Sequence, residues 1–160
     1  MSLNLNDEVS GTSSKYYIST TYTEAVNDAQ FVRPFGIAAL VASILMLFRP
    51  EITIGIGLAI LGFGKTGYYR VLGLAVIITS IIGILIGPLR ILGSTVLCLG
   101  VGWKGIEVLN TLAKEGKGDP DWQDTRKRAI VGIVFSAIGV LINAAWITLL
   151  LIALLNGASR

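Results

Sequence analysis

The sequence predicts an all-α fold, a bundle of helices that crosses a lipid bilayer several times. Apolar residues make up 53% of the chain and charged residues only 14%. The apolar residues form long runs between positions 31 and 155, and one polar stretch of appreciable length, residues 104–128, separates them. A soluble domain of this size exposes far more charge than that, so we expect the runs to face lipid.

The chain starts with a polar segment, residues 1–30, that is rich in Ser, Thr, Tyr and Asn. It lacks the basic start and the apolar core of a cleavable signal peptide. We therefore expect a flexible N-terminal tail over 1–30, without a cleaved signal. A single helical membrane domain should follow over residues 31–156, with a loop at 105–128.

Five apolar segments follow in order, each ended by charge, proline or glycine: residues 34–48, 52–64, 71–87, 91–102 and 129–155. The last holds 27 residues without a charge. At about 1.5 Å per residue it is about 40 Å long, more than the bilayer's hydrocarbon core of about 30 Å. It should therefore tilt or protrude.

The second segment is short, because its 13 apolar residues fall below the usual span of about 17–25. Five spans is the prediction, and four spans with residues 52–64 as a re-entrant segment is the alternative. With five spans, ten basic residues lie on the N-terminal side and three on the other, which places the N-terminus inside. With four spans the N-terminus lies outside. Both topologies place the loop 105–128 in the cytoplasm.

Aromatic and basic residues at the ends of the runs are typical of anchors at the membrane interface. The predicted anchors are Tyr68, Tyr69, Trp103, Trp122, Arg126, Lys127, Arg128 and Trp146.

An internal repeat is also indicated. Shifted by 56 positions, residues 70–87 match 126–143 without a gap, with Arg, Ser and Gly in register. The chain would then be one leading helix followed by two copies of a helix hairpin in a parallel repeat. Chance similarity between glycine-rich membrane helices is the alternative.

Small residues recur at three- and four-residue intervals, which lets membrane helices pack closely. The predicted helix-packing or interaction residues are Ser80, Gly83, Gly87, Ser94, Cys98, Gly102, Gly132, Ser136, Gly139 and Asn143. Asn143 is a strongly polar side chain deep in a span, so it should hydrogen-bond to a neighbouring helix. These faces could hold the bundle together, or bind a second copy or another membrane subunit.

Composition argues against catalysis. The chain has no histidine and one cysteine, so His-based catalysis, Cys clusters and disulfides within the chain are excluded. We expect no metal, no cofactor and no nucleic-acid partner. The middle of each predicted span lacks Asp, Glu, Lys and Arg, which argues against an ion-coupled transporter.

The sequence thus favours a non-enzymatic accessory or scaffolding subunit of a larger membrane assembly, in contact with membrane lipids and with other subunits or itself. A small oligomeric channel or passive carrier is the alternative. A membrane-bound enzyme comes third, and it would draw its acid–base groups from Glu107, Asp119, Asp121 and Asp124.

Overall fold

The computed structural model describes residues 6–64, 66–115 and 121–158, and their side chains from Tyr22 onward. These residues form helices and no strand, which confirms the all-α prediction. The elements are α1 (Asn6–Leu45), α2 (Glu51–Phe63), α3 (Gly67–Leu85), the short 3-10 helix η1 (Gly87–Arg90), α4 (Ile91–Glu115) and α5 (Trp122–Ala158).

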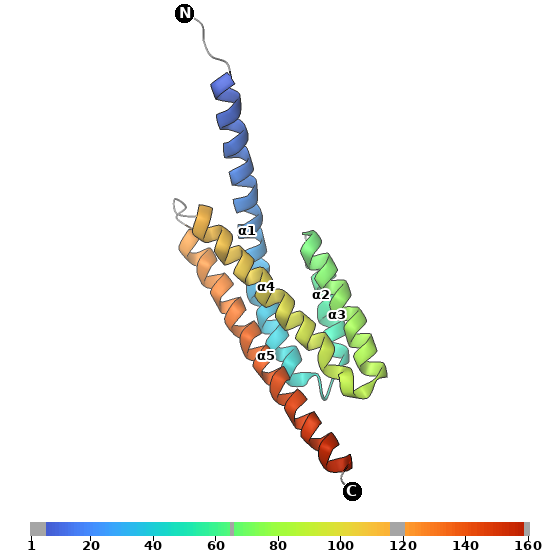
Figure 1. Cartoon of the computed structure of the whole chain (residues 1–160). Helices are drawn as coiled ribbons and strands as arrows, with labels where there is room; N and C mark the ends of the chain where they lie inside the picture. Colours follow the sequence, from blue (N-terminus) through green and yellow to red (C-terminus); the bar gives the residue numbers. More distant parts are fainter. Residues whose placement is uncertain (1–5, 65, 116–120, 159–160) are drawn as a thin grey trace, which may run out of the picture.

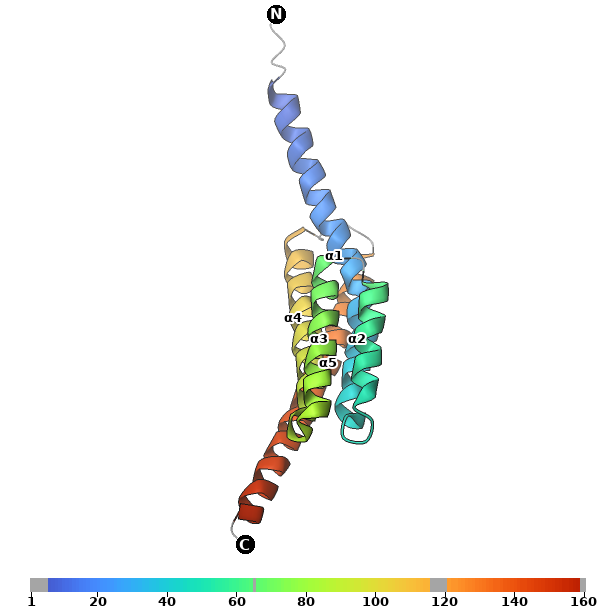
Figure 2. The same cartoon turned by 90° about the vertical axis from the view of Figure 1, so that its right-hand side faces the viewer.

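The helices form a bundle in which successive helices run in opposite directions (Figures 1 and 2). Helices α1, α4 and α5 pack against one another, and α1 and α5 run in the same direction. Helices α2 and α3 form a hairpin that packs on this group mainly through α3 and α4. The start of α1 protrudes at one end of the bundle and the end of α5 at the other (Figure 2).

Four helical segments are long and apolar enough to cross a membrane: Tyr22–Leu45, Gly67–Leu85, Gly87–Glu115 and Trp122–Ala158. The chain is therefore a helical membrane protein by length and composition. Helix α2 has 13 residues and a length of about 20 Å, against a hydrocarbon core of about 30 Å. The choice between five spans and four stays a prediction.

The structure differs from the sequence expectation at the N-terminal tail. Helix α1 begins at Asn6 and continues through Pro34 without a break. Ala25, Ala29, Val32 and Ala39 are buried on one face of α1. These residues recur at helical spacing, so residues 22–30 extend the packed face of the first span although their overall composition is polar.

Glycine allows the two parallel helices α1 and α5 to touch through their backbones. A Cβ atom on Gly36 would lie 2.6 Å from the carbonyl oxygen of Gly132. In the α2–α3 hairpin, a Cβ on Gly73 would lie 2.9 Å from the carbonyl oxygen of Gly57. Both distances are too short for a side chain, so these contacts require glycine. Close packing of this kind is how membrane helices associate without a hydrophobic driving force.

The two hairpins of the predicted repeat correspond to α2–α3 and α4–α5. Ser80 and Ser136, which match in the repeat, are both buried. Gly83 and Gly139 also match, but a Cβ on Gly83 would meet the backbone of η1, whereas one on Gly139 would meet Cys98. The repeat stays a prediction.

Candidate functional site

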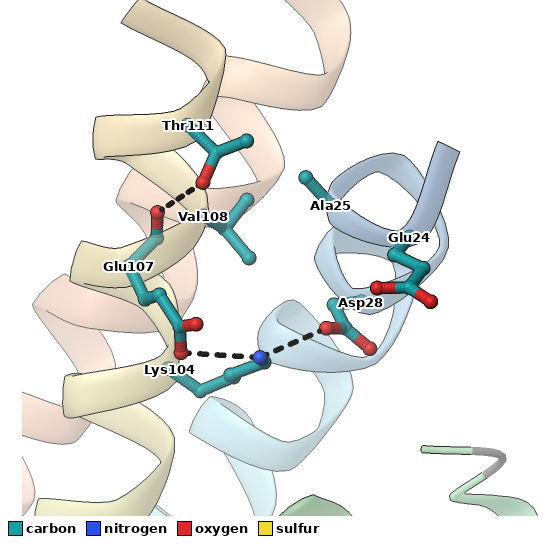
Figure 3. A pocket seen from close by; sticks show the side chains of 7 residues that line it. All are labelled: Glu24, Ala25, Asp28, Lys104, Glu107, Val108 and Thr111. Atoms are coloured by element: carbon teal, nitrogen blue, oxygen red, sulfur yellow. Dashed lines mark hydrogen bonds and ion pairs between the residues drawn. The ribbon is translucent and has the colours of Figure 1, made fainter. Parts of the chain in front are cut away.

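A buried ion pair joins α1 to α4 near the end of the bundle at which α3 begins. The Lys104 Nζ atom lies 3.1 Å from Asp28 Oδ2, and the two side chains are 12% and 5% exposed. The same Nζ lies 3.1 Å from Oε2 of Glu107, whose side chain is 55% exposed. Figure 3 shows the ammonium group between the two carboxylates. Burial of a charge is costly unless it is paired and hydrogen-bonded, and this arrangement supplies both.

Two tyrosines at the start of α3 complete the cluster. Lys104 Nζ lies 5.1 Å from the centre of the Tyr68 ring, within range of a cation–π interaction. The Tyr68 hydroxyl donates a hydrogen bond to the Gly100 carbonyl over 2.7 Å, and that of Tyr69 donates to the Asp28 carbonyl over 3.1 Å. Helix α3 is therefore hydrogen-bonded to α4 and to α1 at the level of the ion pair.

Two small cavities flank Asp28. One, of about 60 Å³, is lined by Glu24, Ala25, Asp28, Lys104, Glu107, Val108 and Thr111 (Figure 3). The other, of about 120 Å³, is lined by Glu24, Asn27, Asp28, Gln30, Phe31 and Thr66. The first is polar and has room for water. The cluster can hold ordered water, and it links the middle of α1 and of α4 to the start of α3. The first cavity is too small for an organic substrate.

Sequence reasoning missed Asp28 because residues 1–30 were assigned to a tail. A signal exists in the sequence, since Asp28 is three residues after Ala25 and four before Val32, both of which are buried in the structure. An acidic residue on such a face needs a buried cation. The spacing does not show that this cation is Lys104.

The carboxylates proposed for an enzyme do not form one group in the described residues. Glu107 pairs with Lys104 on α4, and Asp124 pairs with Arg128 on α5 over 3.0 Å. Asp121 precedes α5, and Asp119 lies outside the described residues. The described residues include no group of three or more His, Cys, Asp or Glu side chains that could hold a metal ion.

The predicted packing residues lie mostly inside the bundle. Eight of them are buried: Ser80, Gly83, Ser94, Cys98, Gly132, Ser136, Gly139 and Asn143. Gly102 is half-buried, and a Cβ on it would lie 3.6 Å from Ser136 Cβ. Gly87 is exposed at the start of η1 with φ of +36°. Glycine tolerates this conformation, and Pro88 disfavours helix at the residue before it, so α3 ends before Gly87.

Asn143 finds its hydrogen-bonding partners within the chain. The Ser94 hydroxyl lies 3.1 Å from Asn143 Oδ1 and can donate to it. The Asn143 amide also donates to Cys98 Sγ over 4.0 Å, and Cys98 Sγ lies 3.3 Å from Ser43 Oγ. The cluster joins α1, α4 and α5, so these small and polar faces support the bundle itself.

The predicted interface anchors lie in different surroundings. Tyr69 is fully buried and Tyr68 half-buried in the ion-pair cluster, so Tyr69 does not face lipid. Trp103 is 70% exposed. Trp146 helps to line an apolar groove of about 280 Å³ between α1 and α5. The remaining predicted anchors, Trp122, Arg126, Lys127 and Arg128, lie on the first turns of α5.

Comparisons with protein-family models, with curated proteins and with solved structures find no match for this chain.

Proposed function

We propose that this membrane protein is a non-enzymatic accessory or scaffolding subunit that binds other membrane helices. The packing of α2 carries the proposal. Thr53, Gly57 and Ile60 face the bundle, whereas the other side of α2 has no neighbour at its small residues. Gly55 and Gly62 have no atom within 4 Å of where a Cβ would stand. They are seven residues apart, so they share one face of the helix.

The length of α2 independently favours a protein neighbour. If α2 crosses the bilayer, as the five-span prediction has it, its length of about 20 Å forces the bilayer to thin around it, and association with another helix is one way to relieve this mismatch. Glycines on the exposed face let a partner's backbone approach closely. A membrane helix whose residues pack closely against Gly55 and Gly62 is therefore the expected partner.

The interior of the bundle gives less support to a channel or carrier. Ala39, Leu97 and Val101 are fully buried in the hydrophobic core of the bundle. Asn143, the strongly polar side chain deep in a span that a solute path would need, is hydrogen-bonded to Ser94. A solute path would have to lie between chains of an oligomer.

The proposal can be tested by gentle extraction of a tagged chain from its native membrane, followed by native mass spectrometry. The wild type should carry at least one stoichiometric protein partner in addition to its own 17.0 kDa. The double variant Gly55→Leu/Gly62→Leu should lose that partner, because two leucines block the approach of the second backbone.

Gly157→Leu is the matched control. Gly157 is also exposed and has no atom near a Cβ position, but it lies at the end of α5. This variant should keep the partner. Equal amounts of partner on the wild type and the double variant, or a wild type that is a bare monomer, would contradict the proposal.

A further inference from the structure

A groove at the start of α5 combines basic and apolar side chains. It has a volume of about 220 Å³ and is lined by Trp122, Gln123, Arg126, Lys127 and Ile130. Arg126 and Lys127 form no salt bridge with a carboxylate of the described residues. The groove therefore has two positive charges that the chain itself leaves without a counter-ion in the described part.

Trp122 joins this groove to α4 and contacts one of its basic side chains. Its indole Nε1–H donates a hydrogen bond to the Leu112 carbonyl on α4 over 3.0 Å. The Arg126 guanidinium lies 5.2 Å from the centre of the indole ring, a distance typical of cation–π contacts. A cation–π contact with a ring that is itself hydrogen-bonded restricts the guanidinium before any ligand arrives. Less conformational entropy is then lost on binding.

The groove lies where α5 changes from charged to apolar. Arg126 and Lys127 precede the charge-free residues 129–155, and Ile130, 39% exposed, is at the start of that run. One end of the groove is therefore suited to an anionic group and the other to hydrocarbon. A soluble anion would use only the basic end, whereas an anionic lipid would use both.

We propose that this groove binds the headgroup of an anionic phospholipid. The phosphate contacts Arg126 and Lys127, and the start of an acyl chain lies against Ile130. Arginine suits phosphate because its planar guanidinium can donate two parallel hydrogen bonds. The inference needs only the membrane location of α5 and is independent of any protein partner.

The test uses the full chain in lipid nanodiscs of equal parts phosphatidylglycerol and phosphatidylcholine, with native mass spectrometry to count retained lipids. The wild type should retain phosphatidylglycerol selectively. Arg126→Gln/Lys127→Gln should weaken that retention about twenty-five-fold, from about fivefold for each basic side chain near an anionic surface. Arg128→Gln is the control, because Arg128 pairs with Asp124 and does not line the groove. It should retain the lipid as the wild type does.

Two further measurements keep the test decisive. Raising the salt concentration should weaken retention by the wild type, because exposed charges are screened; retention independent of salt would overturn the proposal even if the double variant does not fold. Inorganic phosphate, added to the protein in a neutral detergent, should leave its melting temperature unchanged, whereas added phosphatidylglycerol should raise it. Equal stabilisation by both would show a site for free phosphate. Equal losses of lipid in Arg128→Gln and the double variant would show attraction by net charge alone.

Discussion

Removal of Lys104 should destabilise the bundle more than neutralisation of Asp28. Lys104 is the cation for two carboxylates, at 3.1 Å in each case. Lys104→Met would leave the buried carboxylate of Asp28 without its cation. Asp28→Asn keeps a polar group in place and leaves Lys104 paired with Glu107. The asymmetry follows from the number of charged partners that each group has.

The expected magnitudes follow from burial. Breaking a buried ion pair by removal of one partner costs about 3–5 kcal/mol. Lys104→Met should lie near the lower limit, at about 3 kcal/mol, because the adjacent cavity can admit water to the carboxylate. Asp28→Asn should cost less, about 1–2 kcal/mol, because it weakens a buried hydrogen bond without leaving a charge unpaired. The double variant should cost less than the sum of the two, because removal of Lys104 then leaves no buried carboxylate without a cation.

Unfolding in detergent micelles, followed by circular dichroism as a denaturing detergent is added, measures these free energies. Arg128→Gln is the control, since it breaks an exposed pair with Asp124; such a helix pair is worth about 0.3–0.5 kcal/mol. An Asp28→Asn variant as unstable as Lys104→Met, or strictly additive effects in the double variant, would refute the reasoning.

Two more predictions concern the bundle and its topology. Gly139→Leu should lower the melting temperature in detergent more than Asn143→Leu. A Cβ on Gly139 would lie 2.6 Å from Cys98 Sγ, whereas loss of an interhelical hydrogen bond costs about 0.5–2 kcal/mol. A wild-type melting temperature for Gly139→Leu would contradict this packing. If α2 crosses the bilayer, reporters fused to the two ends of the chain should lie on opposite sides of the membrane, the N-terminal one in the cytoplasm; reporters on the same side would favour the four-span topology.

The sequence allows prediction of those features that depend on one helix at a time. Charge-free runs identify the helices and their lipid surroundings, and helical spacing places Ser136, Gly139 and Asn143 on one face of α5, where the structure buries them. Pro88 marks the end of α3 to within a few residues.

Features that depend on two helices together are harder to predict. The pairing of Asp28 with Lys104 requires the register of α1 against α4, which no local pattern contains. Tyr69 shows the same limit. An aromatic residue at the end of an apolar run is typical of an interface anchor, yet Tyr69 is covered by Phe31 and Phe35 of α1. The exposure of Gly55 and Gly62 on α2 was equally unpredictable, because spacing alone does not show which side of a helix a neighbour covers.

The contact between α1 and α5 has a consequence for the biogenesis of the protein. Helices α1 and α5 meet at Gly36 and Gly132, and Val32 of α1 also lies against Gly132. Because α1 is synthesised before α5, the face of α1 that packs on α5 stays uncovered in the membrane until α5 has been inserted. The group of α1, α4 and α5 can therefore close only after α5 has been inserted. In a chain that is truncated before α5, this face of α1 has no partner within the chain, and we expect membrane quality control to degrade such a chain.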